Sequence, residues 1–304
     1  GATLEGPLDV AVGSNLRATG SFDTGAGNDN VTFRSYESLV LEGVGGINTN
    51  GSLLRMIAGS NLTVMGDVST GGGDIRTTSA DNTTFAADAN ISTSGGDLFI
   101  DADGLLNQNV TFEDGALVNL GSGYLRIEAS DEVKLTGIVT TNNDACGDGT
   151  AGCAVTVLAN SINDGGDSRD DIELNGTGGI RLNAHKYANI NKIDYNGATP
   201  LKIEVQGKNQ GARIAGSMLG IDSEAGIEVT KFIANSGAIY APVSESLTVT
   251  EGRLRDDLYL TIGGFDARIG RLADNTLDAN EWLLSSLDDN FFENGALSNG
   301  QREE

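Results

Sequence analysis

The stretch that decides the fold runs Ser60-Asn-Leu-Thr-Val-Met-Gly-Asp-Val-Ser-Thr-Gly-Gly-Gly-Asp-Ile75. Its second half recurs 23 residues later as Asn90-Ile-Ser-Thr-Ser-Gly-Gly-Asp-Leu98, and its first part matches Ser14-Asn-Leu-Arg-Ala-Thr-Gly20 at an offset of 46. Apolar and polar residues alternate within each copy, which indicates half-buried strands, and the glycine pairs between them indicate turns. A period near 23 residues with several short strands is typical of a β-solenoid.

The sequence therefore predicts an all-β protein, a parallel β-helix in which stacked coils bury a continuous column of small aliphatic residues. A β-sandwich or Greek-key barrel is the alternative, but neither would require units to recur at fixed offsets. We expect residues 1–270 to form the β-helix, with a loop at 140–154 protruding from one corner. Residues 271–304 are expected to form a C-terminal cap or assembly tail.

The composition agrees with this fold and excludes several others. The chain has 304 residues with 43 glycines and 3 prolines, and the glycines show no three-residue period, which excludes collagen. Its net charge of −24 argues against nucleic-acid binding, and its single histidine excludes multi-histidine metal sites. No apolar run approaches the roughly 18 residues of a membrane helix. The first residues show no signal-peptide pattern, so we expect a processed chain or a fragment.

The repeat units carry a family resemblance. Ser60–Ile75 and Gly115-Ala-Leu-Val-Asn-Leu-Gly-Ser-Gly-Tyr-Leu-Arg-Ile127 resemble coils of the filamentous-haemagglutinin type. That family comprises large adhesins exported by two-partner secretion in Gram-negative bacteria, with right-handed parallel β-helices as rods. The resemblance implies a secreted protein at the cell surface or in the extracellular matrix. The family's Asn-Pro-Asn secretion motif is absent from this sequence.

On this basis we expect a structural or adhesive protein that is not an enzyme. It would be a rod segment of a surface adhesin or a subunit that stacks head-to-tail into a filament. Its partners would be further copies of the chain, neighbouring adhesin coils, or a glycan or receptor on a cell surface, and not nucleic acid. No cofactor is expected apart from calcium.

Two groups of residues in Gly-rich loops carry more specific predictions. Cys146 and Cys153 bracket six residues and are the chain's two cysteines, so they can close a small disulfide ring in an oxidising compartment. Two free thiols are the alternative. Candidate calcium ligands in acidic loops are Asp29, Asp164, Asp167, Asp170 and Asp171. Ordinary solvated acidic corners are the alternative there.

A carbohydrate-active β-helix, a polysaccharide lyase or glycoside hydrolase, is the rival function. Such a site needs carboxylates beside a base in a cleft with aromatic rings for sugar stacking. Candidate carboxylate pairs are Asp101 with Asp103 and Glu128 with Asp131, and neither has a basic or aromatic partner nearby in sequence. A third cluster joins the single His185 to Lys186 and Tyr187. Asn-x-Ser/Thr triplets begin at positions that include Asn30, Asn61, Asn82, Asn90, Asn109 and Asn175, and we interpret them as chance products of the composition.

The C-terminal segment differs from the repeats. Apolar residues between 282 and 292 suit a short amphipathic helix, with Thr276 or Asp278 as its N-cap. We expect this helix to cap the last coil or to dock onto a second copy. The candidate assembly residues are Trp282, Leu284, Leu287, Phe291 and Phe292.

Overall fold

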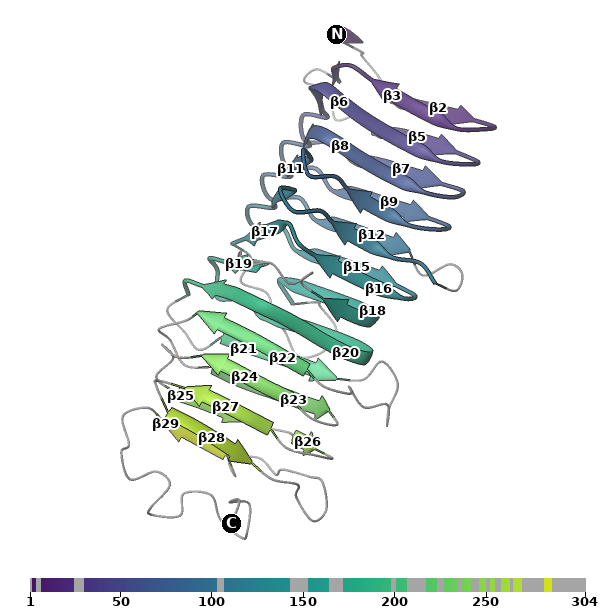
Figure 1. Ribbon diagram of the computed structural model, residues 1–304. Coiled ribbons are helices and arrows are strands. Elements are labelled where there is room, and N and C mark those ends of the chain that lie inside the picture. The colour runs from purple at the N-terminus through teal and green to yellow at the C-terminus, as the bar shows by residue number, and fades with distance from the viewer. Residues whose placement is uncertain are drawn as a thin grey trace. The chain divides into compact units, whose positions relative to one another are not determined.

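The computed structural model (Figure 1) describes most of the N-terminal half of the chain and the separate strands of the C-terminal half. The described residues are 2–3, 7–24, 30–102, 107–142, 153–163, 172–197, 201–206, 217–222, 227–234, 237–241, 246–249, 252–254, 258–262, 265–269 and 282–285. The chain forms two compact units: residues 1–143 with 164–171, and residues 144–163 with 172–304.

In the first unit every turn of the chain adds one strand to each of three parallel sheets. The first sheet contains β2 (Leu8–Val12), β5 (Val31–Ser35), β7 (Leu54–Ala58), β9 (Ile75–Ser79), β12 (Leu98–Ala102) and β15 (Leu125–Ala129). The second contains β3 (Leu16–Thr19), the first halves of β6 (Leu39–Asn48) and β8 (Leu62–Ser69), β10 (Thr83–Phe85), β13 (Val110–Phe112) and β16 (Glu132–Leu135). The third contains β1 (Ala2–Thr3), β4 (Phe22–Asp23), the second halves of β6 and β8, β11 (Asn90–Ser92), β14 (Leu117–Asn119) and β17 (Ile138–Thr141). This is a β-solenoid, as the repeats predict.

The core of this unit is a narrow column of side chains that point inward from the three sheets. Inward residues alternate with outward ones along each strand, so β7 buries Leu54, Met56 and Ala58. In the second sheet Phe85 stacks on Phe112 of the next coil, with ring centroids 4.6 Å apart and planes 5° from parallel. A few aromatic residues are therefore enough to fill this core, because each coil has space for only a few inward side chains.

The glycines of the repeat occupy corners, as expected. In three successive coils the residues after a buried threonine turn back on themselves, and the central positions have positive φ: Asn50 and Gly51, Gly71 and Gly72, Ser94 and Gly95. Each turn is closed by a hydrogen bond from the fourth residue to the first carbonyl, for example Ser52 N to Thr49 O at 3.0 Å. Two successive positive φ values are typical of a type I′ turn, which favours glycine and asparagine.

A ladder of asparagines marks the corner between the first and second sheets. The Oδ1 atom of Asn61 accepts a hydrogen bond from the backbone N–H of Asn82 at 3.2 Å, and Asn82 accepts one in turn from Asn109 N–H at 3.0 Å. Asn109 then accepts one from Glu132 N–H at 3.0 Å. Each side chain therefore satisfies a backbone donor of the following coil, where the strand ladder is interrupted.

The second unit is also built from parallel strands. They are β18 (Val155–Asn163), β19 (Ile172–Leu174), β20 (Ile180–Tyr195), β21 (Leu201–Gln206), β22 (Ser217–Asp222), β23 (Ile227–Ala234), β24 (Gly237–Ala241), β25 (Ser246–Val249), β26 (Gly252–Leu254) and β27 (Leu258–Ile262). The last two strands reverse direction. β28 (Phe265–Ile269) pairs antiparallel with β27, and β29 (Trp282–Ser285) pairs antiparallel with β25.

The prediction of a C-terminal helix is wrong for the residues of this segment that the structure describes. Trp282 and Leu284 belong to strand β29, with Val249 and Leu247 as their register partners in β25. A sheet edge offers a row of backbone donors and acceptors, and pairing with it outweighs a helical pattern of only a few apolar positions. Leu287, Phe291 and Phe292 lie outside the described residues, as do both proposed N-caps. The described ranges contain no α-helix and hence no helix that could cross a membrane.

Candidate functional site

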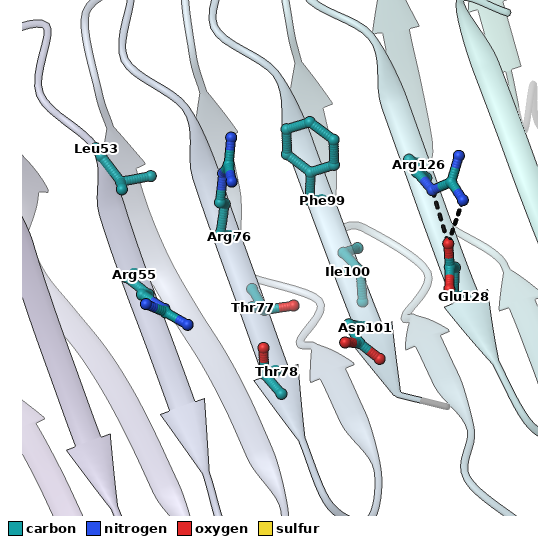
Figure 2. Close-up of a pocket in the computed structure, with 10 residues that line it drawn as sticks. All are labelled: Leu53, Arg55, Arg76, Thr77, Thr78, Phe99, Ile100, Asp101, Arg126 and Glu128. Atoms are coloured by element: carbon teal, nitrogen blue, oxygen red, sulfur yellow. Dashed lines mark hydrogen bonds and ion pairs between the residues drawn. The ribbon is translucent and has the colours of Figure 1, made fainter. Parts of the chain in front are cut away.

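A pocket of about 330 Å³ opens on the outward side of the first sheet, over β7, β9, β12 and β15 (Figure 2). We call it the outer pocket. Its lining combines guanidinium, aromatic, hydroxyl and carboxylate groups from four consecutive coils: Leu53, Arg55, Arg76, Thr77, Thr78, Phe99, Ile100, Asp101, Arg126 and Glu128.

The parallel register brings these side chains together in rows that cross the strands. Arg55 pairs in register with Arg76, Arg76 with Phe99, and Phe99 with Arg126, so one row is basic and aromatic. Two residues further along each strand, the next outward row includes Thr78, Asp101 and Glu128. Because neighbouring strands lie about 4.8 Å apart, each row presents its side chains at short, regular intervals.

Phe99 stands at the centre of the basic row, between two arginines. The guanidinium carbon of Arg76 lies 4.7 Å from the centroid of the Phe99 ring, within the range of a cation–π contact. Tyr124 supports the ring from one edge, with centroids 5.2 Å apart and planes at 84°. The ring is only half-buried although it is apolar and faces outward, so part of its face remains open to a ligand.

Two of the arginines also contact carboxylates. Arg76 Nη2 lies 3.3 Å from Asp74 Oδ2, and both side chains are substantially exposed. Arg126 binds Glu128 through Nε, 2.7 Å from Oε1, and through Nη2 (Figure 2). These are solvent-exposed pairs, each worth at most about 1 kcal/mol of stability, so neither accounts for the clustering of charge.

Acidic and phenolic groups follow the edge of the pocket, one position before each strand. Asp74 Oδ1 accepts the backbone N–H of Asp97 at 3.1 Å, and Asp97 Oδ1 accepts that of Tyr124 at 3.1 Å. Burial raises the pKa of Asp97, and the nearby Asp74 charge adds to this, while the Tyr124 N–H and Arg76 oppose it. Burial also raises the pKa of the Tyr124 phenol, with the charges of Asp97 and Asp74 adding to the effect.

The structure brings together one carboxylate from each of the two predicted pairs. Asp101 and Glu128, one from each pair, are direct register partners on β12 and β15 and both line the outer pocket. Asp131 lies outside the pocket, at the corner after β15, where its backbone N–H donates to Gln108 O at 2.9 Å. Asp103 lies outside the described residues. The view that neither pair has a basic or aromatic partner nearby in sequence is wrong, because Phe99 precedes Asp101 on β12 and Arg126 precedes Glu128 on β15, each by two residues. Neighbouring coils add Arg55 and Arg76.

The predicted cluster of His185, Lys186 and Tyr187 belongs to the second unit. It lies in β20, and the register between β18 and β20 shifts just there, between Ala159 and Ser161. His185 and Lys186 are exposed at this bulge. They are not among the residues that line the outer pocket.

Sequence reasoning missed the outer pocket, although one signal pointed to it. Arginine occupies the same place in three of the predicted strands, Leu54-Arg-Met56, Ile75-Arg-Thr77 and Leu125-Arg-Ile127. Threonine or serine would suffice at an outward strand position. A long charged residue that recurs at the same outward position of several strands therefore indicates a row of side chains with a function. The missing element was Phe99, which interrupts the arginine pattern in the coil between.

Most of the loop predictions fall outside the described residues. Among the calcium candidates this holds for Asp29, Asp164, Asp167, Asp170 and Asp171, so calcium binding stays a prediction. Within the described ranges, no three His, Cys, Asp or Glu side chains gather closely enough to hold a metal ion.

The structure describes only one of the two cysteines in the predicted disulfide. Cys153 is fully buried and its backbone N–H donates to Thr156 Oγ1 at 3.2 Å, whereas Cys146 lies outside the described residues. The pairing therefore stays a prediction, as does the protruding loop around it.

Three of the glycosylation triplets begin in the asparagine ladder. Asn61, Asn82 and Asn109 each accept a backbone hydrogen bond from the following coil. These bonds use the Oδ1 atoms, whereas a glycan would be attached to Nδ2, so the ladder does not decide whether the triplets are modified, and their chance origin stays an interpretation.

Comparison with known proteins adds no relative: no family model, curated protein or solved structure shows significant similarity to this chain. The likeness to β-helix repeat proteins therefore rests on the parallel β-solenoid itself, and the outer pocket has to be interpreted from its own chemistry.

Proposed function

We propose that this chain is an extracellular adhesive protein, a rod segment of a cell-surface adhesin that binds its ligand through the outer pocket. The observation that carries the proposal is the gathering of three arginines, a half-buried aromatic ring and two carboxylates on one sheet face. A scaffold that needed only to be soluble could place small polar residues there. Polar groups around an open aromatic ring are typical of a surface that binds sugars or other hydroxyl-rich ligands.

The repeat style supports the extracellular part of this proposal. The units resemble those of filamentous-haemagglutinin adhesins of Gram-negative bacteria, and the β-solenoid is the fold that such a rod requires. The predicted Cys146–Cys153 pair would agree with an oxidising compartment.

The test is a binding survey with the whole chain. Purified protein is applied to a panel of immobilised neutral, carboxylated and sulfated glycans, and the double variant Arg76→Gln/Phe99→Ala is applied in parallel. Arg17→Gln is the matched control, because Arg17 is an exposed arginine on β3 of the second sheet and pairs with Glu42. We expect wild type and control to bind at least one glycan and the double variant to lose that binding. Absence of binding to every surface would refute the adhesive function.

A filament subunit is the other structural role that the repeat style allows. The antiparallel strands β28 and β29 favour the rod segment, because they interrupt the parallel stacking that a filament of head-to-tail copies would continue. Light scattering and electron microscopy of the full chain distinguish the two, since a filament subunit would polymerise.

A polysaccharide-degrading enzyme is the second candidate, and one observation favours it. Asp101 and Glu128 are register partners beside Arg76, Arg126 and Phe99. Backbones of neighbouring strands lie about 4.8 Å apart, so two carboxylates on register partners can approach the roughly 5 Å separation that retaining glycosidases use. One of these two carboxylates, Glu128, accepts a hydrogen bond from Arg126. This contact is as compatible with a binding site as with an active site.

The enzymatic candidate is tested by measuring reducing ends or unsaturated products after long incubation with polysaccharides. We expect no turnover with wild type. Turnover that is lost in both Asp101→Asn and Glu128→Gln would reverse the order of the two functions.

A further inference from the structure

The basic side chains of residues 1–143 are concentrated on one face. Residues 1–143 contain eighteen Asp and Glu but only six Arg and Lys, which are Arg17, Arg34, Arg55, Arg76, Arg126 and Lys134. Four of these six lie on outward positions of the first sheet, on the consecutive or nearly consecutive strands β5, β7, β9 and β15. We call these four arginines together with Phe99 the arginine face.

This concentration of positive charge destabilises the first sheet. Arg55 and Arg76 are direct register partners, and like charges on neighbouring strands destabilise a sheet. Within the part of the chain that the structure describes, no ion pair or side-chain hydrogen bond is formed by Arg34 or Arg55, and both are exposed. Carboxylates are abundant in this protein, yet none of those that the structure describes pairs with these two guanidinium groups. Both groups are therefore available to an external anion.

The spacing of the charges indicates an extended ligand. Arg55 and Arg76 are one strand apart, and Arg126 is two strands beyond Arg76 with Phe99 between them. At about 4.8 Å per strand, the row spans four strands along a straight line across the sheet. A linear polymer that lies across the strands would meet a cation at three of the four positions and an aromatic ring at the remaining one.

The chemistry of the face selects among anionic polymers. A guanidinium group binds carboxylate or sulfate oxygens in a two-pronged geometry, and an open aromatic ring packs against the apolar face of a sugar ring. The adjoining row contains Thr78, Asp101 and Glu128, which accept hydrogen bonds from hydroxyl groups but repel a dense array of charge. The face therefore suits a chain with one carboxylate per sugar and free hydroxyls, in preference to a heavily sulfated one.

We propose that the arginine face binds a linear polyuronate, a polysaccharide of hexuronic acids, which lies across β7, β9, β12 and β15 with its carboxylates on Arg55, Arg76 and Arg126 and a sugar ring on Phe99. This inference rests on the proposed function, which assigns glycan binding to the outer pocket, and it adds the class of glycan. The net charge of −24 strengthens the selectivity, because polyanions that engage only part of the face are repelled by the rest of the protein.

The experiment is calorimetric titration of the full chain with two polymers that differ only in charge, polygalacturonate and fully methyl-esterified polygalacturonate. We expect binding of the charged polymer only, with affinity that falls at least about tenfold when NaCl is raised to about 0.5 M. The Arg55→Gln/Arg76→Gln variant should bind at least about tenfold more weakly, because two charge-assisted contacts are lost. Arg17→Gln should bind as wild type does, and thermal melting of each variant verifies its fold.

The outcomes separate this inference from the proposed function. Equal binding of the esterified polymer, or tighter binding of heparin or of an oligothymidylate than of polygalacturonate, would overturn the polyuronate assignment. If such binding still depended on Arg76 and Phe99, the adhesive function would stand. An equal loss of affinity in Arg17→Gln would overturn the arginine face as the site, and no binding of any glycan would overturn both proposals.

Discussion

At the scale of single residues, the core contains one position where the side-chain chemistry does not match its surroundings. Thr77 points inward from β9 between its register partners Met56 and Ile100, is 2% exposed, and its Oγ1 atom has no hydrogen-bond partner. Replacing Thr77 by valine removes this unsatisfied hydroxyl and should raise the free energy of unfolding by about 1 kcal/mol. The shift is measured as the midpoint of urea unfolding.

The matched control for this change is Thr93→Val. Thr93 is equally buried, but its Oγ1 donates to Leu120 O at 3.0 Å, so the same substitution should lower the midpoint. A lowered midpoint for both variants would show that the hydroxyl of Thr77 is satisfied.

A second residue-scale prediction concerns the column of glycines at the corner before the first sheet. A β-carbon at Gly96 would overlap the carbonyl oxygen of Gly73 in the preceding coil. Gly96→Ala should therefore force the coils apart and lower the free energy of unfolding by about 1–3 kcal/mol. Gly13→Ala, in open space, should change it by less than about 0.5 kcal/mol. Thermal melting of both variants decides, and equal melting temperatures would contradict close contact of the corners.

A third prediction concerns pH. Since the folded state raises the pKa of Asp97, protonation favours folding, and that gain is present below the unfolded pKa and is lost as pH rises through the folded pKa. Asp97→Asn keeps the oxygen that accepts the Tyr124 N–H but removes the charge. The variant should be more stable than wild type by less than about 1 kcal/mol near pH 7, because the group is partly exposed.

The difference between Asp97→Asn and wild type should shrink as pH falls through the raised pKa of folded Asp97, and it should be gone below about 4, where the carboxyl group is neutral in the unfolded chain as well. Urea unfolding at both pH values measures it. A variant that is less stable than wild type at neutral pH would show that the carboxylate charge supports the corner.

At the scale of elements, the two antiparallel strands at the end of the second unit act as covers. β29 pairs with β25, which otherwise presents a free parallel edge on that side. Removing residues 271–304 should expose this edge and promote edge-to-edge association. Light scattering at increasing concentration measures the result. A truncated chain that stays as monodisperse as the full chain would contradict a capping role for β29.

The elements also show how far sequence reasoning extends. The stretch Ser60–Ile75 predicts its strands and its Thr-Gly-Gly-Gly corner correctly, because alternation and positive φ are local properties. The meeting of Asp101 with Glu128 could not be predicted, since it depends on the exact number of residues in the coil between them. Successive first-sheet strands start 21 to 27 residues apart, at Leu54, Ile75, Leu98 and Leu125, and a shift of one residue turns every side chain to the other face.

The C-terminal helix was wrong for a similar reason. The apolar pattern from Trp282 onward is local and suits a helix, whereas the edge of β25 is about 35 residues away in sequence and provides the actual partner. Local patterns therefore predict strands and corners in this protein, and contacts between coils determine the pocket and the cap.

At the scale of the whole molecule, the acidic chain carries the arginine face on the β-solenoid of its first unit. The solenoid supplies strands at regular spacing, and the repeated arginine position uses that spacing to form a row of cations. Such a surface needs no rearrangement of the backbone, because the sheet fixes the positions from which the side chains project before the ligand arrives, which limits the entropy lost on binding.

Polyuronate binding by the arginine face is tested most directly by a crystal structure of the chain with a bound oligogalacturonate. We expect the sugar chain to cross β7, β9, β12 and β15, with carboxylate oxygens within hydrogen-bond distance of the Arg55 and Arg76 guanidinium groups and a sugar ring packed on Phe99. An oligosaccharide bound away from the first sheet, or one that runs along a single strand without contacting these arginines, would contradict it.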